Sequence, residues 1–188
     1  EIQVSVADHG CGIPPDRLRA VGYGEARPGM PATEHTVYHI GSLSKQFTAA
    51  AVLALMDRGA KAPRSNDPIT LASSARDFFA DVENWDGNGH GPVRLRGLLT
   101  MTSGLPSLVE HPPAQADPWG PITSARMLDG LRKLPVPGTS TGFAYNNSGY
   151  FLLAEIVETV VAGNNLGAAS FVGFVNGNII SRLGLADT

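Results

Sequence analysis

The stretch HIGSLSKQFTAAAVLALMDRG, residues 39–59, decides the fold of this chain. From Ser42 onward its apolar residues recur at the three- and four-residue spacing of a helix, and Gly59 is the usual stop after a last turn. Because both flanks of this pattern are apolar, we expect a helix over about 42–58 that lies inside a domain.

The start of this helix carries a candidate nucleophile and base. Ser42 and Lys45 are three residues apart, which places both side chains on one face of a helix. A serine hydroxyl needs a neighbouring base before it attacks a substrate, and the amino end of a helix favours the negative charge that develops there. The alternative is an N-cap serine followed by an ordinary lysine in the first turn.

A second candidate group, Tyr145-Asn146-Asn147, follows a turn at Pro137-Gly138 and precedes a helix expected at 148–161. A tyrosine in this place can act as general base and acid if a cation such as Lys45 lowers its pKa from about 10. Asn147 would then hold the lysine or a substrate amide. The alternative is a loop tyrosine followed by an asparagine N-cap.

Together these segments resemble the serine β-lactamase and penicillin-binding protein superfamily. The resemblance is closest to class C β-lactamases, D-alanyl-D-alanine peptidases and related esterases, and it covers about residues 18–188. It rests on four segments in order: residues 39–59, RGLLTMTSGLP at 96–106, PGTSTGFAYNNSGYFLLAEIVE at 137–158, and IISRLGLADT at 179–188.

This resemblance implies a serine hydrolase that works through an acyl-enzyme. Ser42 would be the acylated nucleophile, Lys45 its base and Tyr145 the proton shuttle, while Asn147 would contact the substrate or orient the lysine. The backbone N–H of Ser42 would form one half of an oxyanion hole. The implied substrate is a small acyl ester, a β-lactam or a peptide, and no metal or organic cofactor is implied.

The resemblance and the element pattern together predict an α/β (α+β) fold of the β-lactamase/DD-peptidase type, with a helical region and an incomplete antiparallel sheet. Strands are expected at 4–7, 18–23 and 36–40. Residues 1–40 would thus form the N-terminal strands and hairpin, and residues 41–188 the nucleophile helix and helical region of a single domain. Further helices are expected at 96–101, 123–134 and 171–183.

The third motif of this superfamily, Lys-Thr-Gly or a variant, is expected on a strand after Tyr145, and none appears before Thr188. Trp85-Asp86-Gly87 has the letters of a variant but precedes Tyr145, so we interpret it as a loop. We therefore expect that the C-terminal strands are missing and that the chain associates with itself or with a complementary C-terminal fragment. A catalytically weak fragment or binding module of the same fold is an alternative.

Residues 4–18, VSVADHGCGIPPDRL, resemble the D-x-G-x-G-I-P box of histidine-kinase and gyrase-type ATPases. This similarity leaves open an ATP-binding module around Asp8–Gly12. The upstream Asn-bearing helix and the later glycine-rich lid of those ATPases are not found, which favours a hairpin turn made by Gly10, Gly12 and Pro14.

Composition argues against several other classes. The net charge is -3, from 14 Lys and Arg against 17 Asp and Glu, so no nucleic acid partner is expected. The longest apolar stretch, 47–56, is too short to span a bilayer. The single cysteine, Cys11, excludes an internal disulfide and a multi-cysteine metal site. No signal-peptide pattern is visible, which leaves the bacterial periplasm, secretion and the cytoplasm all open.

Overall fold

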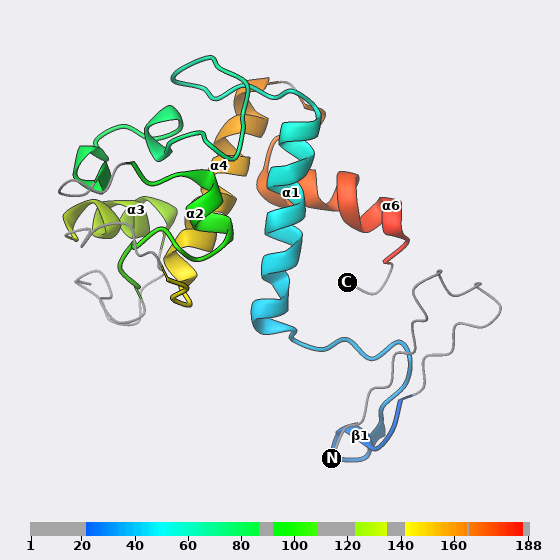
Figure 1. The fold of residues 1–188 in the computed structure, drawn as a ribbon. Helices are drawn as coiled ribbons and strands as arrows, with labels where there is room; N and C mark the ends of the chain where they lie inside the picture. The colour runs from blue at the N-terminus through cyan, green and yellow to red at the C-terminus, as the bar shows by residue number, and fades with distance from the viewer. Residues whose placement is uncertain (1–21, 87–91, 109–122, 135–141, 165, 186–188) are drawn as a thin grey trace. The chain divides into compact units, whose positions relative to one another are not determined.

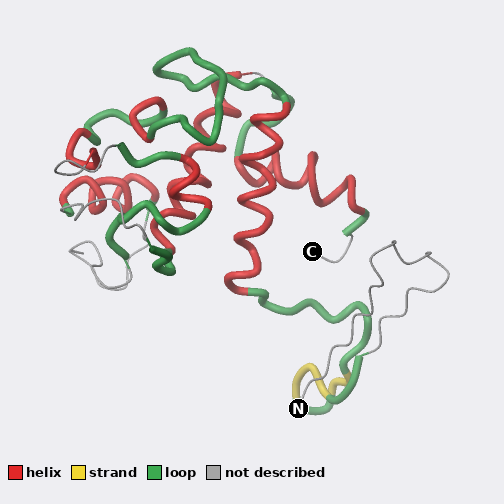
Figure 2. The backbone as a smooth tube through the Cα atoms, viewed as in Figure 1, coloured by secondary structure: helices red, strands yellow, loops and turns green. Residues whose placement is uncertain are grey.

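The computed structural model describes residues 22–86, 92–108, 123–134, 142–164 and 166–185. The described part is rich in helix and has one small two-stranded antiparallel sheet (Figures 1 and 2). The chain divides between Gly41 and Ser42 into two compact units. The larger unit, Ser42–Gly184, contains the helices α1 to α6.

The first helix, α1 (Lys45–Asp57), follows a 3₁₀ turn at Gly41–Ser44. Its alanines, leucines and methionine are strong helix formers. It ends in a Schellman motif, because Gly59 adopts a φ of 62° and donates to Met56 O at 3.0 Å, and Ala60 N–H donates to Leu55 O at 3.0 Å. The predicted helix and its glycine stop are confirmed.

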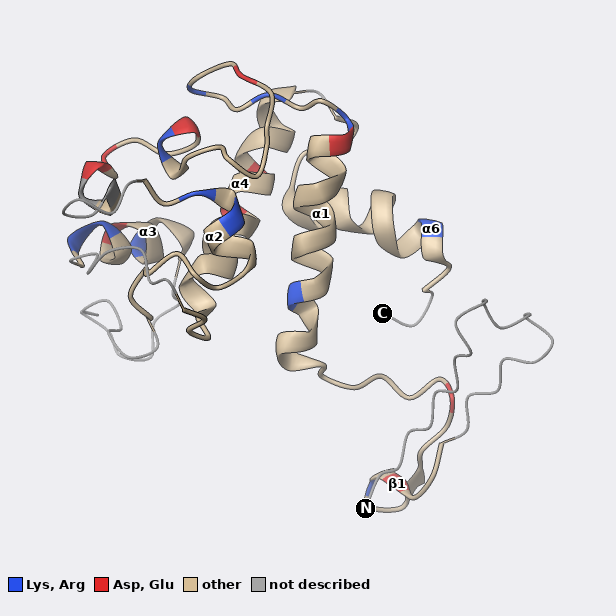
Figure 3. Ribbon diagram, in the orientation of Figure 1, with Lys and Arg blue, Asp and Glu red and all other residues tan. Residues whose placement is uncertain are grey.

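Only one face of α1 is buried. That face consists of Thr48, Ala51, Val52 and Leu55, whereas Leu53 on the other flank is 51% exposed. Figure 3 shows most of α1 without charged side chains. The predicted helix inside a domain is thus found with most of its apolar residues packed on the core, and Leu53 is the exception.

The longest helix, α4 (Asn147–Asn164), lies at the centre of the larger unit. It contacts α1, α2 (Leu95–Leu99), α3 (Ser124–Lys133) and α5 (Phe171–Val175). Its fully buried aliphatic residues form the middle of the hydrophobic core: Leu152, Leu153, Ile156, Val157, Val160 and Val161. Burial of this surface, which contributes roughly 25 cal/mol per Å², holds the other helices around α4. The predicted helices α2 and α4 are confirmed.

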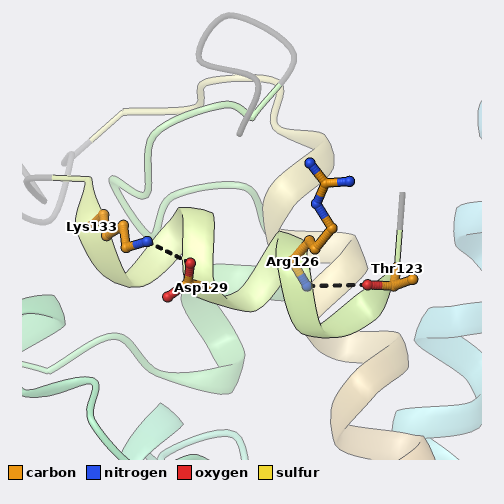
Figure 4. A network of polar contacts seen from close by, with 4 residues as sticks. All are labelled: Thr123, Arg126, Asp129 and Lys133. Carbon is orange, nitrogen blue, oxygen red and sulfur yellow. Dashed lines mark hydrogen bonds and ion pairs between the residues drawn. The ribbon is translucent and has the colours of Figure 1, made fainter. Parts of the chain in front are cut away.

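The helix α3 is defined by its N-cap and attached through one buried leucine. Thr123 Oγ1 accepts a hydrogen bond from the Arg126 backbone N–H at 3.4 Å, and Lys133 donates to Asp129 at 2.6 Å across one turn (Figure 4). An exposed i,i+4 ion pair contributes only about 0.3–0.5 kcal/mol. The fully buried Leu131, with Met127 and Leu128 partly buried beside it, attaches α3 to the core. The helix predicted at 123–134 is confirmed, and Thr123 is its N-cap.

Trp85, which the sequence places in a loop, packs in this core. It lies in a 3₁₀ turn, Glu83–Asp86, is 1% exposed, and packs edge-on against Phe79 with ring centroids 6.3 Å apart. Its indole Nε1–H donates to Leu131 O at 3.3 Å. The Trp85 ring can be buried although its neighbours Glu83 and Asp86 are charged residues, because its N–H has a hydrogen-bond partner.

The last helical segment runs through α5, a π-helical turn (Asn176–Ile180) and α6 (Ser181–Leu183). Ser170 caps α5, because its Oγ accepts from Gly173 N–H at 3.1 Å. Gly184 ends α6 at a φ of 64°. The helix predicted over 171–183 is confirmed, with the π turn as an addition.

The sheet is a short hairpin in the smaller unit. The strands β1 (Glu25–Arg27) and β2 (Met30–Pro31) pair antiparallel, with Arg27 opposite Met30. Gly29 in the turn has a φ of 76°, which fits the Pro-Gly pair of a type II turn. A helix-rich chain with a small antiparallel sheet confirms the predicted fold class.

The strand positions differ from those predicted. Residues 36–40 form no strand in the structure, and Val37 is 72% exposed. Strand propensity depends on a pairing partner and a buried face, and the described chain offers this segment neither. The strand predicted at 4–7, and residues 18–21 of the next, lie outside the described residues.

The predicted boundary near residue 40, the missing strands and the association with a second chain stay predictions. No helix within the described ranges combines the length and the apolar character needed to cross a membrane.

Candidate active site

The candidate nucleophile and base meet where α1 begins. Ser42 lies in the 3₁₀ turn before the helix, and Lys45 is the first residue of α1. The Lys45 Nζ donates to Ser42 Oγ at 2.9 Å. Ser42 is exposed and Lys45 is half-buried, so the pair is open to a ligand from solvent.

Tyr145 and Asn147 join this pair from a segment one hundred residues further along the chain. Lys45 Nζ donates to Tyr145 Oη at 2.9 Å and to Asn147 Oδ1 at 2.7 Å. The hydroxyls of Ser42 and Tyr145 lie 2.5 Å apart. The packing of α1 against α4 brings these ends of the two segments together. All four residues predicted from the sequence therefore share one hydrogen-bonded cluster.

The cluster changes the acidity of its tyrosine. The hydrogen bond from Lys45, followed by the one with Ser42, holds the pKa of Tyr145 below its ordinary value of 10.0. Partial desolvation opposes this shift, and the charge of Lys45 adds to it. A tyrosine with a lowered pKa beside a serine hydroxyl can accept and return a proton near neutral pH more readily than an isolated phenol.

A second tyrosine faces the same lysine. Lys45 Nζ lies 5.0 Å from the ring centroid of Tyr145 and 5.8 Å from that of Tyr150, both within the range of a cation–π contact. The Tyr150 hydroxyl donates to Leu99 O at 3.1 Å, and burial raises the pKa of Tyr150. Tyr150 thus stays a neutral hydrogen-bond donor, and of the two tyrosines Tyr145 is the one suited to proton transfer.

The sequence analysis missed two features: the contact of Tyr150 with Lys45, and the hydrogen bonds of the buried Asn146 side chain to Leu105 and Gly149. Tyr150 is three residues after Asn147 on α4, so helical spacing places it on the same face, and this signal could have identified it. The buried contacts of Asn146 join segments forty residues apart, which no local pattern indicates.

The residues of the ATPase-like segment, among them Asp8, Gly10, Gly12 and Cys11, lie outside the described residues. Within the described ranges, no three His, Cys, Asp or Glu side chains gather closely enough to hold a metal ion.

Comparison with known proteins shows the family of this chain. The model of the family described as Beta-lactamase matches residues 7–188. The chain belongs to this family. Penicillin-binding protein 4* of Bacillus subtilis (strain 168) is 26% identical over 171 residues, which are 89% of this chain and 33% of that protein. The chain thus spans about a third of the length of this curated relative.

Solved structures agree with this membership of the Beta-lactamase family. The octameric penicillin-binding protein homologue from Pyrococcus abyssi has a TM-score of 0.67 and 28% identity, covering 90% of this chain and 36% of its own. The D-stereospecific amidohydrolase from Streptomyces sp. has a TM-score of 0.59 and 27% identity, and the match covers 83% of this chain and 46% of the amidohydrolase. The family and these relatives support a function of the serine-hydrolase type.

Proposed function

We propose that the protein hydrolyses an ester or an amide, as an esterase or a β-lactamase-like enzyme, through an acyl-enzyme on Ser42. The observation that carries this proposal is that Lys45 Nζ lies within hydrogen-bond distance, 2.7–2.9 Å, of Ser42 Oγ, Tyr145 Oη and Asn147 Oδ1. A serine with a positioned base within hydrogen-bond reach is the arrangement that nucleophilic catalysis requires.

In the acylation step, Ser42 Oγ attacks the substrate carbonyl carbon and loses its proton to Lys45, which accepts it as an uncharged amine after the Lys45–Tyr145 pair has lost one proton. The carbon–oxygen or carbon–nitrogen bond to the leaving group then breaks, and Tyr145 gives that group a proton. Lys45 returns a proton to Tyr145 across their 2.9 Å hydrogen bond. Asn147 holds Lys45 in place through its side-chain oxygen.

In the deacylation step, a water molecule attacks the acyl ester on Ser42 and the same groups act in reverse. The water gives its proton to the Lys45–Tyr145 pair, and Ser42 Oγ takes one back as the acid product leaves. Amides belong to the proposed substrate range because one related structure is that of a D-stereospecific amidohydrolase.

The test is a substrate panel with two variants. The panel contains p-nitrophenyl esters of several acyl lengths, a chromogenic cephalosporin and D-amino acid p-nitroanilides. We expect turnover of at least one class of these substrates. It should be lost in Ser42→Ala and retained in Asp8→Asn, a variant that alters the ATPase-like segment at residues 4–18. Turnover that survives in Ser42→Ala would refute the proposal, and binding of a fluorescent ATP analogue that is lost in Asp8→Asn would favour the ATP-binding alternative.

A further inference from the structure

Asn146 lies between the two residues that contact Lys45, but its own side chain is buried. Asn146 is 8% exposed, whereas its neighbour Tyr145 is 53% exposed. The chain therefore alternates here, with Tyr145 and Asn147 directed to the lysine and the amide between them directed into the protein. A buried amide of this kind needs partners for both its donor and its acceptor.

Both halves of the Asn146 amide have partners in different parts of the fold. Its Oδ1 accepts a hydrogen bond from Gly149 N–H at 2.9 Å, which is the N-cap bond of α4. Its Nδ2 donates to Leu105 O at 2.6 Å, in the segment that follows α2. One side chain thus fixes the start of α4 and ties it to a second segment.

Two further hydrogen bonds join the same pair of segments. Ala144 N–H donates to Met101 O at 3.0 Å, and Leu108 N–H donates to Ser148 Oγ at 2.8 Å. Met101 adopts a φ of 55°, a left-handed conformation that is costly for this residue type. The bond from Asn146 to Leu105 lies between these two hydrogen bonds in the sequence. Residues 144, 146 and 148, on both sides of Tyr145 and Asn147, are therefore each hydrogen-bonded to the segment that follows α2.

We propose that Asn146 is a positioning residue for the acyl transfer: its buried amide holds Tyr145 and Asn147 against Lys45 by anchoring the start of α4 to Leu105. This inference rests on the proposed function for its catalytic consequence. A displacement of about 1 Å at a reacting group can reduce a rate by up to about 100-fold, so the loss of this anchor is expected to slow acylation.

The test compares Asn146→Ala with Ser170→Ala. Asn146→Ala removes the cap of α4 and the tie to Leu105, whereas Ser170→Ala removes only the cap of α5, and both are compared at a temperature where they are folded. Asn146→Ser, which keeps a capping oxygen, is the second variant in case Asn146→Ala does not fold. One readout is the limiting rate of labelling by a fluorophosphonate. The other is the titration of Tyr145, followed by NMR of protein labelled with ¹³C at tyrosine Cζ and assigned with Tyr145→Phe.

We expect labelling to fall by about 10- to 100-fold in Asn146→Ala, by less in Asn146→Ser, and by less than twofold in Ser170→Ala. Tyr145 should titrate at a higher pH in the Asn146 variants, because its hydrogen bond from Lys45 loosens. If the folded Asn146 variants keep both the labelling rate and the Tyr145 titration of the wild type, the inference is wrong. If the wild type is not labelled at all, the proposed function fails, and the Tyr145 titration alone decides the role of Asn146.

Discussion

Replacement of Lys45 by alanine should stop acylation and leave the fold intact. Lys45 Nζ contacts Ser42 Oγ, Tyr145 Oη and Asn147 Oδ1, so this one change removes the proposed base and three contacts of the cluster. A positioned base contributes about 10²- to 10⁴-fold, and the loss should be of that size or larger because the groups act as a unit.

The cost to stability should be small. Each lost hydrogen bond contributes about 0.5–1.5 kcal/mol at most in this open site. Two effects offset this cost, because alanine is the better helix former and because Lys45 places a positive charge at the amino end of α1. We expect the free energy of unfolding to fall by no more than about 2 kcal/mol.

The assay follows labelling of Ser42 by mass spectrometry, with stability measured by urea denaturation. The matched control is Lys133→Ala, which removes a lysine whose side chain is 72% exposed and contacts only Asp129 among the interactions the structure defines. We expect the control to keep the wild-type labelling rate. Labelling of Lys45→Ala within threefold of the wild type would refute the assignment of Lys45 as the base.

The pH dependence, the core and the backbone each give one further prediction. The acylation rate should rise through an apparent pKa below 10.0 that belongs to the Lys45–Tyr145 pair, because the pair must lose a proton before it can accept one. Tyr145→Phe should move this rise to a different pH, and an unchanged pH profile would contradict the role of Tyr145. Trp85→Phe should lower the free energy of unfolding by about 1–3 kcal/mol in urea, because the Leu131 carbonyl loses its buried donor. Met101→Val should destabilise by about 1–2 kcal/mol more than Met101→Gly, since a β-branched residue is poorly tolerated at a φ of 55°, and equal effects would contradict this.

Much of the larger unit follows from local sequence signals. The periodicity of α1 and its Gly59 stop, and the cap of α3 at Thr123, depend on residues within a few positions of one another. Helical spacing likewise places Ser42 beside Lys45. Such features can be predicted because their physical cause lies within a single turn of helix.

The features that sequence reasoning missed depend on partners far away in the chain. Residues 36–40 look like a strand, but a strand needs a neighbour to pair with, and the described structure provides none. Trp85 looks like part of a glycine-rich loop until Leu131 is seen to accept its N–H. The amide of Asn146 is a local cap by sequence, and only the fold shows its bond to Leu105.

The most direct test of the account is intact mass spectrometry of the protein before and after a fluorophosphonate, followed by peptide mapping. The account predicts a single adduct on Ser42, which is absent in Ser42→Ala, because Lys45 and Tyr145 both contact the Ser42 hydroxyl. The absence of any adduct on the folded protein, or an adduct on a different serine, would contradict it.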